Sequence, residues 1–166
     1  MEILSAGPFA DYWDGVRGRT KRVMMAIPPA HLEWAPGPGR WTFGDTIRHL
    51  AGIERDMYAE NVQDRPSRYP GHGRELADGI DAVVAYLDRK HAEAQAIFRA
   101  LTPEQLQGKS QTVAGTPITT AKWLRAMVEH EAHHRGQIYL MLGLLGVPAP
   151  PLYGLTEPEV KARSVP

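Results

Sequence analysis

The stretch 129–142, EHEAHHRGQIYLML, carries three histidines and two glutamates in its first six positions, and its apolar residues recur at helical spacing. On a helix, His130 and His134 lie about 40° apart on one face, close enough for the two imidazoles to share a metal ion. His133 is turned about 60° from His130 and about 100° from His134, so it is the poorer partner. Trp123, Met127, Gln137 and Met141 fall on the same face, so most of it is apolar, which predicts a metal site buried inside a helical bundle.

Two other interpretations of this stretch stay open at this point. A lone His-x-x-x-His pair is equally compatible with two partly solvated histidines on a polar helix face. Residues 130–134, HEAHH, also satisfy the H-E-x-x-H pattern of zinc proteases. The longer protease pattern fails, because it requires glycine at 137 and histidine at 140, where this chain has Gln137 and Leu140. The neighbouring segments also lack the strand that lines a protease cleft, so a peptidase is disfavoured.

Outside this helix, three further apolar-periodic segments are separated from it and from one another by prolines and glycines. Together the four segments predict an all-α protein, an antiparallel four-helix bundle with a short proline-rich C-terminal extension. Thr42 and Asp45 resemble a capping box at the start of the second helix, and residues 112–118, TVAGTPI, form either a small hairpin or a loop. The long helices are expected at residues 8–27, 42–63, 77–101 and 119–145.

The composition indicates one domain spanning residues 1–166, with 43% hydrophobic residues to form a core. Nineteen basic and nineteen acidic residues give zero formal net charge, which disfavours a nucleic-acid binder. The chain has neither a run of eighteen apolar residues nor the pattern of a signal peptide, so no membrane span is expected. The absence of cysteine excludes disulfides, thiolate metal ligands and a cysteine nucleophile, and it favours a cytoplasmic protein.

A third metal ligand has to come from another helix, and His49 is the best candidate, because it lies on the apolar stripe of the second segment. Asp45 and Asp56 are expected on the same face. From there a carboxylate could contact a metal-bound water or the second nitrogen of a histidine ligand.

The other histidines rank lower as site residues. His91 falls on the apolar stripe of the third helix, where it is expected in the core or near the pocket. His31 and His72 lie in loops rich in proline and glycine and are expected to be solvated. Arg135, next to the histidines, is expected to form a salt bridge at the helix surface.

The chain resembles the DinB-like superfamily in two segments that are separated by a long predicted helix. They are WTFGDTIRHLAGIE at 41–54 and TPITTAKWLRAMVEHEAHHRGQIYLMLGLLG at 116–146. The resemblance covers nearly the whole chain, and HEAHHRGQ is its most specific part. It implies a four-helix bundle that holds one divalent metal ion through His49, His130 and His134. It gives His133 no role as a ligand.

The resemblance also implies a range of reactions. Similar proteins include transferases and isomerases that use bacillithiol, mycothiol or glutathione, and metal-dependent hydrolases. We expect a thiol-dependent S-transferase that acts on small electrophiles. A metal-dependent hydrolase and a non-catalytic, stress-related metal-binding bundle are the alternatives. Zinc or nickel is the expected ion, ahead of iron or manganese. Glu131, Asp45 and Asp56 are candidates for orienting ligands or moving protons.

A homodimer is also expected, because related proteins often pair and the last helix has apolar residues on more than one face. Four of them lie away from the metal face: Leu124, Val128, Tyr139 and Leu142. Some must pack on the first and third helices, and the remainder would cover a partner. The other expected partner is a small-molecule substrate, with a low-molecular-weight thiol as one candidate.

Overall fold

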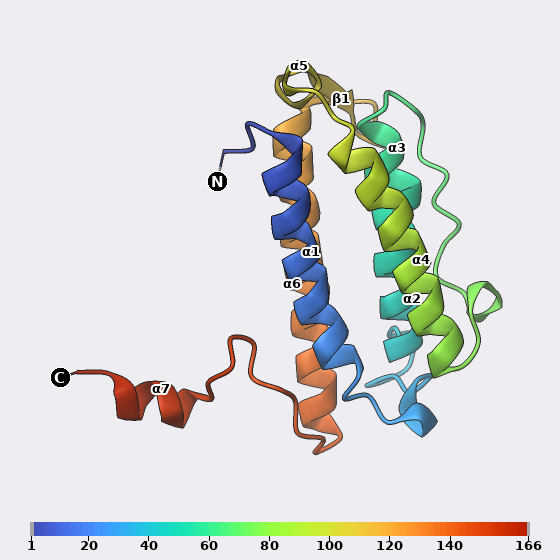
Figure 1. The fold of residues 1–166 in the computed structure, drawn as a ribbon. Helices are drawn as coiled ribbons and strands as arrows, with labels where there is room; N and C mark the ends of the chain where they lie inside the picture. Colours follow the sequence, from blue (N-terminus) through green and yellow to red (C-terminus); the bar gives the residue numbers. More distant parts are fainter. Residues whose placement is uncertain (1, 166) are drawn as a thin grey trace.

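The computed structural model describes residues 2–165 and contains four long helical segments arranged as a bundle (Figure 1). The all-α four-helix bundle predicted from the sequence is confirmed, and each boundary lies within three residues of the expected one. The long segments are α1 (Ala6–Met24), a continuous stretch of α2 (Phe43–Ile53), η2 (Glu54–Tyr58) and α3 (Ala59–Asn61), then α4 (Ile80–Arg99) and α6 (Thr120–Leu144).

Local sequence signals account for where these helices begin and end. The Thr42 side chain accepts a hydrogen bond from the backbone N–H of Asp45, and the Asp45 carboxylate accepts one from the backbone N–H of Thr42. This is the predicted capping box, and it satisfies two N–H groups that the first turn leaves free. At the other end of the chain α6 stops before Gly146, whose φ of +68° suits glycine.

The order of the helices differs in one respect from a simple up-and-down bundle. One apolar cluster contains the starts of α1 and α6 and the ends of α2 and α4, whereas the other contains the ends of α1 and α6 and the starts of α2 and α4. Helix α1 therefore runs parallel to α6, and α2 runs parallel to α4. The connection 62–79 makes this possible, because it returns along α2 before α4 starts (Figure 1). Eighteen extended residues reach roughly 60 Å, whereas nineteen helical residues span only about 28 Å.

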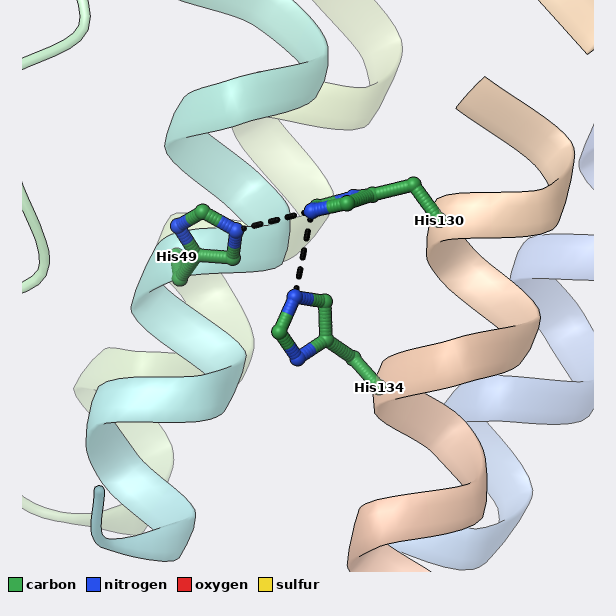
Figure 2. Close-up of side chains that lie close together, drawn as sticks. All are labelled: His49, His130 and His134. Atoms are coloured by element: carbon green, nitrogen blue, oxygen red, sulfur yellow. Dashed lines mark hydrogen bonds between the residues drawn. The ribbon is translucent and has the colours of Figure 1, made fainter. Parts of the chain in front are cut away.

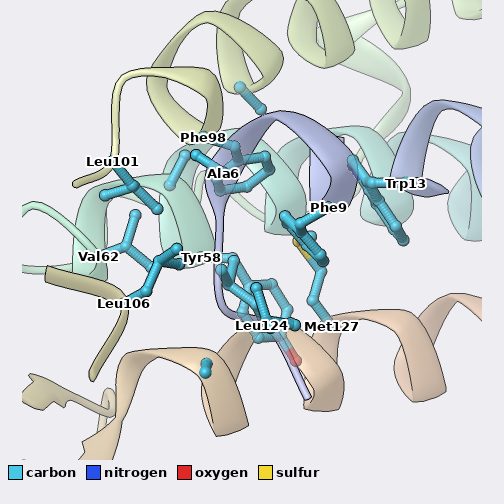
Figure 3. Close-up of a cluster of buried hydrophobic side chains, with 14 of the residues drawn as sticks. Ala6, Phe9, Trp13, Tyr58, Val62, Phe98, Leu101, Leu106, Leu124 and Met127 are labelled. Atoms are coloured by element: carbon cyan, nitrogen blue, oxygen red, sulfur yellow. The ribbon is translucent and has the colours of Figure 1, made fainter. Parts of the chain in front are cut away.

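Two apolar clusters form the core, one toward each end of the bundle. The cluster in Figure 3 joins the first half of α1 to the start of α6, and it includes Phe9, Trp13, Phe98 and Leu124. The second joins the end of α1 to the end of α6. On α1 the buried residues Arg17 and Thr20 lie between the two clusters, and on α6 Glu131, His134 and Arg135 do. The middle of the bundle is therefore a polar layer, with apolar packing above and below it.

This packing changes the argument for a homodimer. Leu124 and Leu142 are completely buried inside the chain, and Val128 and Tyr139 are packed against the two clusters. The four apolar residues that suggested a partner surface are thus used largely by the bundle itself, and the homodimer stays a prediction.

Smaller elements close the ends of the bundle. The short helix α5 (Pro103–Gln107) has its own capping box at Thr102, and residues 112–118 belong to a hairpin between β1 (Lys109–Gln111) and β2 (Pro117–Thr119). The hairpin was one of the two alternatives for this segment. In the proline-rich tail, α7 (Glu157–Arg163) lies away from the bundle (Figure 1). Among residues 2–165 no helix is long and apolar enough to cross a membrane.

Candidate metal centre

His49 of α2 and His130 and His134 of α6 point toward one another in the polar layer (Figure 2). The Nε2 atom of His130 lies 3.1 Å from the Nε2 atom of His49 and 3.1 Å from that of His134. Two nitrogen ligands of one zinc ion, each about 2.0–2.1 Å from it, are separated by about 3.3 Å in tetrahedral geometry. The structure therefore brings together the three predicted ligands at a spacing that suits one small divalent ion.

The helices fix this arrangement from two sides. One helical turn separates His130 from His134, which places both imidazoles on the inner face of α6. His49 comes from the middle of α2, which runs antiparallel to α6, so its ring meets theirs across the bundle (Figure 2). His49 and His134 are buried, and His130 is half-buried.

Burial and mutual proximity keep these imidazoles neutral. Loss of hydration, reinforced by the neighbouring histidines, lowers the pKa of His49 to about 3 and the pKa of His130 to about 4. Burial also lowers the pKa of His134. A neutral imidazole offers a lone pair to a metal ion, whereas a protonated one does not. The donor set of three neutral nitrogens fits a borderline ion such as zinc or nickel.

Two further side chains hold the outer nitrogens of the ligand histidines. The Nδ1 atom of His49 lies 2.6 Å from the Tyr69 hydroxyl, and the Nδ1 atom of His134 lies 2.7 Å from Oε1 of Gln137. When Nδ1 carries the proton and donates to these oxygens, the lone pair of each ring resides on Nε2 and faces the other histidines. Tyr69 and Gln137 thus favour the tautomer that metal binding requires.

The remaining histidines of the region stand one step further out. Nε2 of Gln137 donates to Nε2 of His133 at 3.1 Å, and the His133 ring packs edge-on against His134 with centroids 4.9 Å apart. Its nitrogens do not join the group of three. His72 lies 3.4 Å from the Tyr69 hydroxyl and packs on Trp41. His72 is half-buried and not simply solvated as expected, because the returning segment 62–79 presses its loop against α2.

Tyr69→Phe is expected to weaken zinc binding about ten-fold, because phenylalanine cannot accept the hydrogen bond from Nδ1–H that fixes the tautomer of His49. Affinity would be measured by competition with a chromophoric chelator, and the tautomer of His49 by nitrogen NMR of the metal-free protein. Tyr139→Phe is the control, since it removes a hydroxyl that donates to the Pro150 carbonyl at 2.7 Å, away from the triad. Equal affinities in the two variants would contradict the role given to Tyr69.

The three carboxylates proposed as ligand-orienting groups have other partners. Asp45 caps α2 and lies 3.0 Å from Arg48, while Asp56 lies 2.8 Å from Lys90. Asp56 lies within the π-helical turn η2, and its carboxylate is directed to α4 by the pair with Lys90. Glu131 is buried and forms an ion pair with Arg17 at 3.2 Å. It follows His130 by one residue, which turns its side chain about 100° around the helix axis, away from the face of the triad. Their catalytic roles stay predictions.

Arg135 and His91 also face the polar layer. Arg135 is buried and donates to the Val16 carbonyl and the Thr20 hydroxyl. It does not lie at the helix surface, where a salt bridge was expected. His91 is half-buried, with its Nδ1 atom 2.8 Å from Glu54 and its ring facing Trp13. Its Nε2 atom lies 3.1 Å from the exposed Asp14, so His91 joins the buried Glu54 to the surface.

Trp41 is the site residue that the sequence did not single out. Its indole ring stacks on His134, with ring centroids 5.6 Å apart and planes 10° apart, and it also lies beside His49 at 4.8 Å. One signal was available, since Trp41 directly precedes the N-cap of the helix that carries His49. No such signal existed for Tyr69, which reaches His49 only because the connection 62–79 runs back along α2.

The fold and the site define the class: this is a four-helix-bundle protein with a candidate metal centre. Its three imidazoles converge from the second and last long helices. Comparison with known families matches residues 12–138 to the DinB superfamily. The match spans most of the chain, and the chain belongs to the DinB superfamily.

Individual relatives are similar to the chain over most of its length. The chain is 23% identical over 158 residues to the Bacillus subtilis protein named uncharacterized protein YrdA, covering 91% of this chain and 89% of YrdA. The crystal structure of a DinB-like protein from Bacillus cereus superposes with a TM-score of 0.67 at 17% identity, covering 86% of this chain and 94% of that one. The DinB-like protein YjoA of Bacillus subtilis superposes with a TM-score of 0.69 at 17% identity, covering 90% of this chain and all of YjoA. At these identities the likeness shows the shared fold.

Proposed function

We propose that this chain is a metal-dependent enzyme that transfers a low-molecular-weight thiol to a small electrophile, with His49, His130 and His134 holding one divalent ion. The observation that carries the proposal is the convergence of three neutral Nε2 atoms, two of them 3.1 Å from the third, inside the bundle. Zinc or nickel suits three imidazoles better than manganese or iron does.

A metal ion in this site would supply charge that stabilises a thiolate, or would lower the pKa of water. The chain contains no cysteine, so the reacting sulfur has to come from a second substrate. In the reaction the thiol sulfur forms a bond to an electrophilic carbon, the leaving group departs with the electron pair of the broken bond, and the thiol proton passes to solvent.

The side chains around the triad have separate tasks in this proposal. Tyr69 and Gln137 fix the tautomers of the ligand histidines, as their contacts with the Nδ1 atoms indicate. Trp41 covers His134 with its ring and limits the access of water from that side. The neutral, desolvated imidazoles leave the positive charge of the ion uncompensated, which favours an anionic sulfur in the site.

The test is turnover of a thiol with 1-chloro-2,4-dinitrobenzene, followed by the absorbance of the thioether product. Cysteine, glutathione and bacillithiol would be compared, using protein loaded with zinc or nickel and protein stripped by a chelator. We expect metal-dependent conjugation with at least one thiol, and loss of that activity in His134→Ala. If no thiol is consumed while a nitrophenyl ester is hydrolysed in a metal-dependent way, the protein is a hydrolase and the transferase proposal is wrong. If neither reaction depends on the metal, the bundle binds metal without turnover.

A further inference from the structure

A pocket of about 400 Å³ opens directly beside the triad, within the size range of small-molecule sites. Its wall includes the ligand histidine His134 and the residue that orients it, Gln137. The stacked ring of Trp41 separates this pocket from His49. The other lining residues come from the turn before α2, from α2 itself and from the last turns of α6: Pro36, Gly39, Arg40, Thr46, Leu140 and Met141.

The lining of this pocket carries positive charge and no negative charge. Arg40 is exposed at its wall, and none of the residues that line it is an aspartate or a glutamate. The nearby carboxylates of Glu33 and Asp45 are held by Arg48, at 2.8 and 3.0 Å, so they do not neutralise Arg40. A tight turn presents this arginine: its backbone N–H donates to the Gly37 carbonyl, and Gly39 adopts a φ of +68°.

The rest of the lining is largely apolar. The Trp41 ring is 37% exposed and Leu140 is 65% exposed, although both are large hydrophobic side chains. Together with Pro36 and Met141 they form a surface on which a flat or aliphatic group would be removed from water. The polar atoms of Gln137 and Thr46 are already used, by the two histidines and by the Thr42 carbonyl. Arg40 is therefore the lining residue whose cationic side chain can bind an anionic part of a ligand.

From these contacts we infer that the pocket beside the triad binds a small organic carboxylate, with its anionic group on Arg40 and its apolar body against Trp41 and Leu140. The inference deepens the proposed function, because it places one substrate next to His134 and assigns it a chemical class. A guanidinium forms paired hydrogen bonds with a carboxylate, and this geometry gives orientation as well as affinity.

A larger hollow of about 650 Å³ lies at the other end of the bundle, between residues 61–67 and the hairpin. It contains an exposed arginine, Arg65, but no triad residue lines it. Size alone would favour this hollow, whereas proximity to His134 favours the smaller pocket. Arg65 therefore serves as the matched control for Arg40.

The experiment compares two probes of similar shape, 3-phenylpropionate and 3-phenylpropan-1-ol, neither of which contains a thiol. Binding to chelator-stripped protein is followed by NMR through the indole N–H signal of Trp41, assigned with Trp41→Phe. We expect the carboxylate to bind about ten-fold tighter than the alcohol, and this preference to shrink in high salt. Arg40→Gln should weaken the carboxylate five- to ten-fold and leave the alcohol unchanged, while Arg65→Gln should change neither.

The inference is overturned if both probes bind equally to the wild-type protein, if neither binds, or if Arg65→Gln weakens the carboxylate as much as Arg40→Gln does. His130→Ala separates it from the proposed function, since His130 is a predicted ligand that does not line the pocket. Retained probe binding in His130→Ala, together with lost metal, supports the pocket independently of the metal. Metal-dependent turnover without selective probe binding leaves the proposed function standing and removes the pocket from it.

Discussion

His134→Ala and His130→Ala are each expected to abolish stoichiometric metal in the purified protein. Each ligand contributes one of the three converging Nε2 atoms, and two remaining imidazoles hold a divalent ion poorly. His133→Ala should retain the metal, because His133 is not one of the three residues whose nitrogens converge. It contacts the triad through a hydrogen bond with Gln137 and through the edge of its ring, which packs on His134. The measurement is elemental analysis of protein purified without a histidine tag, supported by metal titration of the stripped protein.

His133→Ala is a close control, since it removes the same side chain from the same helix, next to a predicted ligand. It should weaken the metal only slightly, through the lost contact with Gln137. Loss of the metal from His133→Ala together with its retention in His130→Ala would show that the wrong face of α6 had been assigned to the ion.

Arg17→Ala is expected to lower the free energy of unfolding by about 3 kcal/mol, at the lower end of the range for a broken buried ion pair. Arg17 is 3% exposed and lies 2.5 Å from Glu54 and 3.2 Å from Glu131, both of which are almost fully buried. Its removal leaves these carboxylates without their common counter-charge. The effect stays moderate for two reasons. Glu54 keeps His91, and burial raises the pKa of Glu131, so this group takes up a proton more easily.

Thermal unfolding of the metal-free protein would measure this effect, with an expected fall in Tm of roughly 6–12 °C for a chain of this length. Lys21→Ala is the control on the same helix: its ion pair with Asp88 is 2.6 Å long but about half exposed, so it contributes less than about 1 kcal/mol. Equal losses in the two variants would mean that the buried position of Arg17 adds nothing to its interaction with the two glutamates.

Much of the fold could be read from the chain because helices leave local signals. Apolar spacing, the capping box at Thr42 and Asp45, and the glycine after α6 depend on residues close in sequence, and these predicted the helices to within three residues. The orientation of α2 relative to α4 had no such signal. It follows from how the chain 62–79 packs along α2, where the Arg48 guanidinium donates to the carbonyls of His72 and Ala77.

In the candidate site, too, some features follow from local sequence and others only from tertiary packing. His130 and His134 share a face through helical periodicity alone. His49 was inferred from its place on the apolar stripe of the second helix, and the resemblance to the DinB-like superfamily selects the same residue. The carboxylates Asp45, Asp56 and Glu131 were ranked by their position on ideal helices. That ranking could not include the π-helical turn at 54–58, or the demand of a buried Arg17 for negative partners.

By itself, then, the sequence determined the four helices, the shared face of His130 and His134 on α6 and the absence of cysteine. Only the tertiary structure decided that Tyr69 and Trp41 complete the site, that Glu131 serves Arg17, and that a pocket with Arg40 at its wall opens beside His134. The physical reason is the separation in sequence between the residues that interact. Helix formation is governed by residues three or four positions apart, whereas the surroundings of the triad are assembled from segments that meet only after the bundle has packed.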